Sequence, residues 1–308
     1  LDAGFPADKI VFAGVGKADW EINLGLDNDI FCFNVESAVE LEIINELAAT
    51  KNKVASIALR INPEVDAHTH AKITTGMKEN KFGINLSQLG GVLDKLKEMK
   101  NVKLIGIHSH IGSQITDMSS FRNLVIRFNE IQEELEAHGV TVENLNFGGG
   151  LGIDYYHPNH LSIPAFDNYF AAIHKLLQVR PGQQVHFEPG RSIVAQCGTL
   201  ISKVLYVKEG ETKKFAILDA GFTELIRPAM YDAYHRIENI SSDEAVETYD
   251  VVGPICESSD VFGKDVELNK AHRGDLIALR SAGAYGEVMA SQYNCRHLPK
   301  AYYSDTIK

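Results

Sequence analysis

Short apolar runs alternate with amphipathic stretches over the first two-thirds of the chain. The apolar runs predict strands at residues 10–13, 29–34, 54–61, 102–110, 142–147 and 184–188. Helical periodicity predicts helices at 37–49, 87–99, 119–138 and 164–177, and Ser37 followed by Glu40 is typical of a helix start. The linker at residues 63–85 is less regular. Because the strands are apolar on both faces, we expect a parallel sheet covered by helices.

A doubly wound sheet and a barrel both fit this alternation, and the polar clusters distinguish them. Most predicted strands end in such a cluster: AGVGK, FNVES, LRINP, HSHIGSQ, FGGGLGI and FEPGR. Polar residues at the carboxyl ends of many successive strands are typical of a TIM barrel, which has eight strands in about 250 residues. Six strands are predicted before residue 195. We therefore expect residues 1–194 to form a (β/α)8 TIM-type barrel that lacks its first two βα units.

The pattern changes after Arg191, where helical periodicity becomes scarce. Strands are predicted at 195–207, 214–219, 245–252 and 275–279, followed by a closing helix at 284–293. Residues 195–308 are therefore predicted to form a second, mostly antiparallel β domain.

Composition and charge narrow the function classes. The 308 residues are 44% hydrophobic and carry a formal net charge of -11, which favours a folded protein and disfavours binding to nucleic acid or acidic membranes. No apolar run approaches the ~18 to 20 residues of a membrane helix. The four cysteines lack zinc-ligand or disulfide spacing, so we expect a cytoplasmic protein without a metal site, in which Cys32 and Cys197 are small buried residues.

Two loops point to a phosphate group. The glycines Gly148, Gly149 and Gly150 follow one predicted strand, and the segment Glu188-Pro189-Gly190-Arg191 follows the next. Glycine lets backbone N–H groups approach an anion closely. With two units missing, these loops follow barrel strands seven and eight, where TIM barrels commonly bind phosphate.

Two histidines at a strand end suggest an alternative function, that of a metal-dependent hydrolase. His108 and His110 lie two residues apart, so they share one face of a strand. Metal-dependent hydrolase barrels use such a pair together with histidines and an aspartate from later strands. Here the later strands end in GGG and EPGR, which cannot complete a metal shell. The metal hydrolase stays a minor alternative, beside a purely structural role for both histidines.

The second domain holds further candidates. Cys256 lies in a polar, turn-like segment rich in carboxylates, where a thiol can donate a proton. Arg227 and Tyr231 are four residues apart, which is one turn if the segment is helical. Arginine binds carboxylates through two parallel hydrogen bonds.

Six ordered motifs together resemble the diaminopimelate decarboxylase family. They are HIGSQ at 110–114, GGGLG at 148–152, EPGR at 188–191, RPAMY at 227–231, CESSD at 256–260 and GAYG at 283–286. These enzymes depend on pyridoxal 5'-phosphate and have the alanine-racemase-like fold, a barrel followed by a β domain. The resemblance covers essentially the whole chain. It implies a lyase that converts meso-2,6-diaminopimelate to L-lysine and CO2, the last step of lysine biosynthesis.

The resemblance also implies roles for individual residues. The expected cofactor contacts are His110 stacked on the ring, Glu188 at the pyridine nitrogen, and Ser113, Gly149, Gly150, Pro189, Gly190, Arg191 and Tyr285 around the phosphate and ring. The expected substrate contacts are Arg191, Arg227, Tyr231, Tyr285 and, for the distal ammonium, Glu257. Cys256 is similar to the family's proton donor. In that family a second subunit supplies Cys256 and Glu257, which implies a homodimer with shared active sites.

One family feature is missing from this sequence. The family attaches its cofactor to a lysine at the end of the first barrel strand, and no matching segment is present. Lys17 follows a predicted strand but matches a rim lysine of the family's third unit. We therefore expect the chain to begin just before barrel strand three and to be inactive in this form. The alternatives are a non-catalytic homologue that binds or regulates a decarboxylase, and a related pyridoxal-phosphate decarboxylase of basic amino acids.

Overall fold

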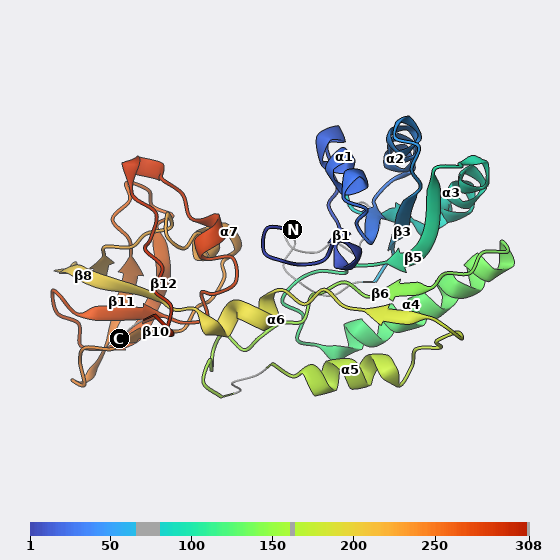
Figure 1. Cartoon of the computed structure of the whole chain (residues 1–308). Helices are drawn as coiled ribbons and strands as arrows, with labels where there is room; N and C mark the ends of the chain where they lie inside the picture. The colour runs from blue at the N-terminus through green and yellow to red at the C-terminus, as the bar shows by residue number, and fades with distance from the viewer. Residues whose placement is uncertain (66–80, 161–163, 307–308) are drawn as a thin grey trace. The chain divides into compact units, whose positions relative to one another are not determined.

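The computed structural model describes residues 1–65, 81–160 and 164–306, so most of the less regular linker lies outside the described residues. By its internal contacts the chain divides into two compact units (Figure 1). We call the first the barrel unit, which comprises Leu1–Leu151 and Ala165–Pro189. We call the second the β unit, which comprises Gly152–Pro164 and Gly190–Lys308.

The barrel unit is a sheet of parallel strands with helices around its outside (Figure 1). Its strands pair in the order β1 (Val11–Phe12), β2 (Cys32–Val35), β3 (Ala55–Asn62), β5 (Val102–His108), β6 (Asn144–Asn146) and β7 (Gln184–His186), and β4 (Ile84–Asn85) pairs with β3. Its α-helices are α1 (Asp19–Asp27), α2 (Ala38–Thr50), α3 (Leu86–Glu98), α4 (Met118–Ala137) and α5 (Phe166–His174). Because the strand order never reverses, the sheet is part of a barrel and not doubly wound. This confirms the predicted fold.

Local sequence explains where these helices begin and which face they bury. The Ser37 side chain accepts a hydrogen bond from the Glu40 N–H, which caps α2 as predicted. Helix α4 buries Phe128 against the core, where its ring stacks on Phe147 at a centroid distance of 4.1 Å. Phe147 directly precedes the three glycines, so core packing fixes the start of that loop.

The β unit is built on a six-stranded sheet. The strands pair in the order β10 (Ile237–Asn239), β13 (Leu276–Leu279), β8 (Leu200–Glu209), β9 (Lys214–Leu218), β11 (Val246–Val252) and β12 (Val261–Asn269). All neighbours are antiparallel except β9 and β11. Two short helices, α6 (Arg191–Val194) and α7 (Arg227–Tyr231), belong to this unit. The mostly antiparallel β domain is therefore confirmed.

Three local predictions were wrong or incomplete. The helix at 284–293 does not form: Glu287–Met289 and Tyr293–Cys295 are single 3-10 turns. Tyr285 has a left-handed φ of 63°, and Val288 is 80% exposed, so this segment has neither helical backbone nor an apolar face to bury. The strand expected from residue 195 begins at Leu200, and β12 was not predicted because charged residues interrupt its apolar pattern.

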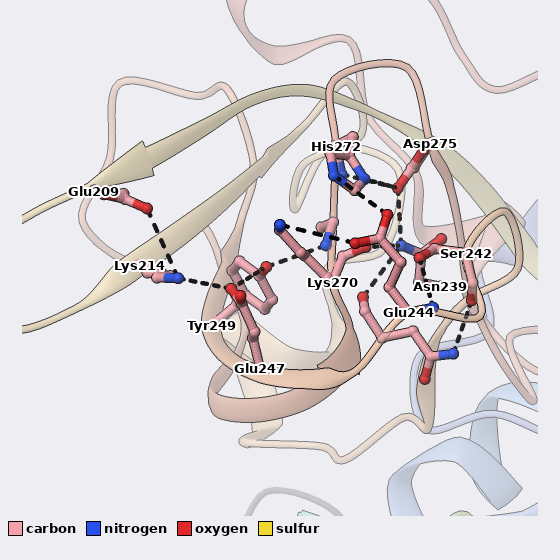
Figure 2. A network of polar contacts seen from close by, with 12 residues as sticks. Glu209, Lys214, Asn239, Ser242, Glu244, Glu247, Tyr249, Lys270, His272 and Asp275 are labelled. Atoms are coloured by element: carbon pink, nitrogen blue, oxygen red, sulfur yellow. Dashed lines mark hydrogen bonds and ion pairs between the residues drawn. The ribbon is translucent and has the colours of Figure 1, made fainter.

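A network of polar side chains joins strands and turns of the β unit (Figure 2). Glu247 accepts hydrogen bonds from Lys214 Nζ at 2.7 Å and from the Tyr249 hydroxyl at 2.9 Å. Asp275 accepts one from the Asn239 amide at 3.0 Å and one from the His272 N–H at 2.8 Å. None of the predicted site residues takes part in these bonds, so the network serves to hold the sheet.

Within the described residues, every helix is too short or too polar to cross a lipid bilayer.

Candidate active site

The carboxylate of Glu188 lies where several strands of the barrel unit end. Its Oε1 accepts hydrogen bonds from Asn146 Nδ2 at 2.9 Å and from Asn34 Nδ2 at 3.3 Å. Its Oε2 lies 3.3 Å from Nε2 of the buried His108. Partial burial would raise the pKa of Glu188, but His108 and Asn146 favour the charged form and lower the pKa to about 2. Glu188 is therefore a fixed anion whose side chain is 34% exposed.

His110 lies beside this anion as a neutral ring. Its Nδ1 accepts a hydrogen bond from the Gly149 N–H at 3.1 Å, so that nitrogen carries no proton. Burial, with Arg60 and His108 nearby, lowers the pKa of His110 to about 4. His110 and the glycine loop are thus joined directly. His108 Nε2 lies beside the same carboxylate.

The three glycines bring neighbouring loops into backbone contact. A Cβ on Gly149 would lie 2.3 Å from the Glu188 carbonyl oxygen, and one on Gly150 would lie 2.7 Å from the Gly112 carbonyl oxygen. Gly150 also has a φ of 111°, which L side chains rarely adopt. The loops after β5, β6 and β7 therefore meet only because these positions lack side chains. Ser113 lies half-buried in the first of these loops.

Two ion pairs fix the ends of the earlier strands. Lys17 Nζ lies 2.5 Å from Glu40 Oε1 and also donates to the carbonyl oxygens of Gly14 and Asn34. Three acceptors therefore engage its amine.

The second ion pair joins two of the predicted motifs. Arg60 Nη1 lies 2.6 Å from Glu36 Oε1, and both side chains are buried. Glu36 Oε2 accepts a hydrogen bond from the Gly83 N–H at 2.9 Å. This buried pair therefore holds the end of β3 against the Lys81-Phe82-Gly83 segment.

The β unit contains a second cluster, which we call the arginine cluster: Tyr155, Arg191, Arg227 and His235. The hydroxyl of Tyr155 accepts a hydrogen bond from Arg191 Nη1 at 2.7 Å, and its ring centroid lies 5.1 Å from the Cζ of Arg227. Arg191 and Arg227 are 5% and 4% exposed. Among the residues that the structure describes, no carboxylate forms an ion pair with Arg227. Burial and the nearby Arg191 lower the pKa of Arg227.

Two tyrosines complete the surroundings of these arginines. Helix α7 places Tyr231 one turn after Arg227, as the spacing predicted, and Tyr231 is half-buried. The Tyr285 ring centroid lies 5.1 Å from the Cζ of Arg191. A Cβ on Gly190 would lie 3.2 Å from the Tyr285 hydroxyl. Gly190 and Arg191 therefore lie close to Tyr285, although 95 positions separate Gly190 from Tyr285 in the sequence.

Cys256 and Glu257 lie together on an exposed loop after β11. The buried Asp260 holds this loop, because its carboxylate accepts from the Ile255 N–H at 2.7 Å and from the Phe222 N–H at 2.6 Å. The Tyr293 hydroxyl donates to Glu257 Oε1 at 2.8 Å.

The predicted burial is confirmed for Cys32 but wrong for Cys197. Cys32 is buried as expected, and burial raises its pKa to about 12. Cys197 was expected to be buried and is exposed, because residues 195–197 form a 3-10 turn and not the start of a strand.

Several site residues were missed from the sequence. Asn34 and Asn146 hold Glu188; Asn34 lies inside the recognised motif FNVES, and Asn146 directly precedes the motif FGGGLGI. Their positions at strand ends were the signal by which the sequence could have identified them. Tyr155 and His235 carry no comparable signal, because only folding brings them to the two arginines.

A family model now defines the class of protein. The model described as "Pyridoxal-dependent decarboxylase, pyridoxal binding domain" matches residues 1–195. Together with the barrel-type sheet and the β domain, this match defines a pyridoxal-dependent decarboxylase, a lyase whose cofactor is pyridoxal phosphate.

Individual relatives are more specific. The chain is 68% identical over 305 residues to a diaminopimelate decarboxylase of Bacteroides thetaiotaomicron, covering 99% of this chain and 79% of the relative. It is 45% identical over 302 residues to that of Haemophilus influenzae, covering 96% of this chain and 71% of the relative. The crystal structure of diaminopimelate decarboxylase from Helicobacter pylori complexed with L-lysine superposes with a TM-score of 0.88 at 41% identity, covering 95% of this chain and 73% of that one. The chain belongs to the diaminopimelate decarboxylase family.

The residues of the barrel unit fit the cofactor. Pyridoxal phosphate has a basic ring nitrogen, a flat ring and a phosphate. Glu188 is an ionised, partly exposed carboxylate that suits a protonated ring nitrogen. His110 offers a neutral ring beside it, and the half-buried Gly150 adds backbone without a side chain.

The close approach at Gly149 leads to a prediction. Gly149→Ala places a methyl group against the Glu188 carbonyl oxygen, so we expect the free energy of unfolding to fall by about 1–3 kcal/mol and cofactor affinity to fall with it. Urea unfolding and a titration with pyridoxal phosphate measure both effects. The matched control is Gly91→Ala in α3, where no atom lies within 4 Å of the added Cβ; it should be neutral or stabilise by about 0.5–1 kcal/mol. Unchanged cofactor affinity in Gly149→Ala would contradict the role given to this contact.

Proposed function

We propose that this protein decarboxylates meso-2,6-diaminopimelate to L-lysine and CO2 with pyridoxal phosphate as cofactor. The observation that carries this proposal is the arginine cluster, in which the buried guanidinium of Arg227 is held by neutral partners. A buried cation without a counter-charge is costly, so this arrangement suits a ligand that brings a carboxylate. The relatives named diaminopimelate decarboxylases support the same substrate, which has a carboxylate at each end.

The cofactor would be held mainly by the loops that follow the strands. Glu188 would keep the ring nitrogen protonated, and His110 would lie against the ring. The phosphate would be bound by Ser113, the backbone of Gly149 and Gly150, and Tyr285, with Pro189, Gly190 and Arg191 forming the adjoining loop. When bound, pyridoxal phosphate supplies an electron sink that lets the α-carboxylate of the substrate leave as CO2.

Selectivity would come from the residues that bind the far end of the substrate. Arg191, Arg227 and Tyr231 would bind the distal carboxylate, with Tyr285 beside them, and Glu257 would bind the distal ammonium. A diamino acid without a distal carboxylate would leave the buried guanidinium of Arg227 without a counter-charge. Polar mismatches of this kind discriminate by about 10⁴-fold or more.

Cys256 would donate the proton that replaces CO2 on the substrate carbon. The support for this role is its exposed thiol on a loop that Asp260 holds in place, beside the carboxylate of Glu257. A positioned acid delivers its proton to one face of the carbon, which bulk water does not.

We also propose a cytoplasmic homodimer with shared active sites. In such a dimer, one subunit would present Cys256 and Glu257 to the other. Their exposure and their common loop support this assembly.

The direct test is an assay of the full-length protein with pyridoxal phosphate and meso-diaminopimelate. We expect stoichiometric release of CO2 and L-lysine. Cofactor binding without release of CO2 would contradict the proposed function and would favour a non-catalytic homologue.

The substrate assignment predicts a defect in Arg227→Met. Removal of the guanidinium should raise the KM for meso-diaminopimelate on the order of 30-fold or more, because a buried charge pair is lost, while cofactor uptake persists. Steady-state kinetics and the absorbance of the bound cofactor check both parts. The control is Arg236→Met, since Arg236 is half exposed and lies 3.8 Å from its partner Glu238. An unchanged KM in Arg227→Met would remove Arg227 from the substrate site.

The proton-donor assignment predicts a different defect. Cys256→Ala should lower kcat by about 10²- to 10⁴-fold, the usual contribution of a general acid, and leave the cofactor absorbance unchanged. Cys197→Ala, at an exposed thiol away from the Cys256 loop, serves as control and should keep the wild-type kcat. Equal turnover in the two variants would show that Cys256 does not donate the proton.

A further inference from the structure

We propose that His235 is a positioning residue, which holds the guanidinium of Arg227 ready for the distal carboxylate of the substrate. This inference rests on the proposed function. It assigns a role to a residue that the sequence did not single out, and it concerns how Arg227 is held and not whether Arg227 binds substrate.

The hydrogen bonds of His235 determine its tautomer. The Nδ1 atom lies 2.9 Å from the carbonyl oxygen of Arg280, which can only accept, so Nδ1 must carry the proton. In a neutral ring Nε2 then has a free lone pair. That atom lies 2.8 Å from Nη1 of Arg227, which can only donate. His235 therefore links Arg227 to the backbone just after β13.

The surroundings keep this arrangement in one geometry. His235 is 1% exposed, and its ring lies edge-on to Tyr155 at a centroid distance of 5.2 Å. The backbone of Arg280 is itself fixed, because its N–H donates to the Arg236 carbonyl oxygen at 2.8 Å. Burial, with Arg227 and Arg191 nearby, lowers the pKa of His235 to about 4. The ring thus remains a neutral acceptor near pH 7.

Because His235 is neutral, it affects the charge of Arg227 differently from a carboxylate. A carboxylate at this position would neutralise Arg227 and compete with the carboxylate of the ligand. Histidine fixes one N–H of the guanidinium and leaves its positive charge uncompensated. The Arg227 guanidinium therefore has a fixed orientation and a positive charge without a counter-ion. A carboxylate-binding site requires both.

Two variants with amide side chains test the hydrogen bonds of His235 to Arg280 and to Arg227 one at a time. In His235→Asn the short side chain can reach Arg280 O but not Arg227, whereas in His235→Gln the longer one can place an acceptor at the former Nε2 position. The ligands are L-lysine, which keeps the distal carboxylate of the substrate, and cadaverine, which has none. Their dissociation constants are measured by absorbance with the full-length, cofactor-loaded protein.

We expect His235→Asn to weaken L-lysine binding about tenfold or more and cadaverine binding less than about twofold. His235→Gln should recover L-lysine binding to within about threefold of the wild type. His272→Leu is the control, because this histidine is half exposed and belongs to the polar network of Figure 2. It should bind both ligands as the wild type does.

Three results would overturn the proposal: unchanged L-lysine binding in His235→Asn, equal losses for both ligands, or no recovery in His235→Gln. If His235→Asn does not take up cofactor, His235→Leu replaces it under the same criteria. A wild-type protein that binds L-lysine no more tightly than cadaverine would instead contradict the proposed substrate class, and the role of His235 would fall with it.

Discussion

An ionised carboxylate joins the ends of three parallel strands in the barrel unit. Glu188 is held by Asn34 near the end of β2, by His108 at the end of β5 and by Asn146 at the end of β6. The two amides and the histidine favour the charged form, and among the residues that the structure describes no arginine or lysine forms an ion pair with Glu188, so the anion suits a protonated ring nitrogen. The loops around it meet through backbone, because glycine occupies the positions where a Cβ would collide. In the proposed function, recognition of the cofactor ring and of its phosphate would both depend on this arrangement.

In the β unit, a buried cation is held by neutral partners in the same way. Arg227 is buried, and its partners His235 and Tyr155 are neutral. Such a site is costly for the protein alone, since a desolvated cation lacks a counter-ion. A bound carboxylate would offset this cost, and in the proposed function this difference would be the source of selectivity for a substrate with a second carboxylate. Lys213 and Lys214, in contrast, pair directly with acidic side chains and serve the fold.

The sequence predicts those features of the fold that depend on residues close together along the chain. The repeated βα pattern predicted six barrel strands, and the strand order confirmed them, because period and apolar faces are local properties. The predicted helix at 284–293 does not form because Tyr285 adopts a left-handed backbone conformation that side-chain propensity does not reveal. Strand β12 was missed because its pairing with β11 outweighs its charged residues.

The same division holds for the site. The sequence by itself determined the motifs and their order, and therefore the family, since GGGLG, EPGR, RPAMY and CESSD are short contiguous segments. Only the tertiary structure decided which asparagines hold Glu188, that Lys17 is committed to Glu40, and that His235 supports Arg227. The physical reason is that the charge state and orientation of a side chain are set by neighbours distant in sequence, which burial and hydrogen bonding select only after the chain has folded.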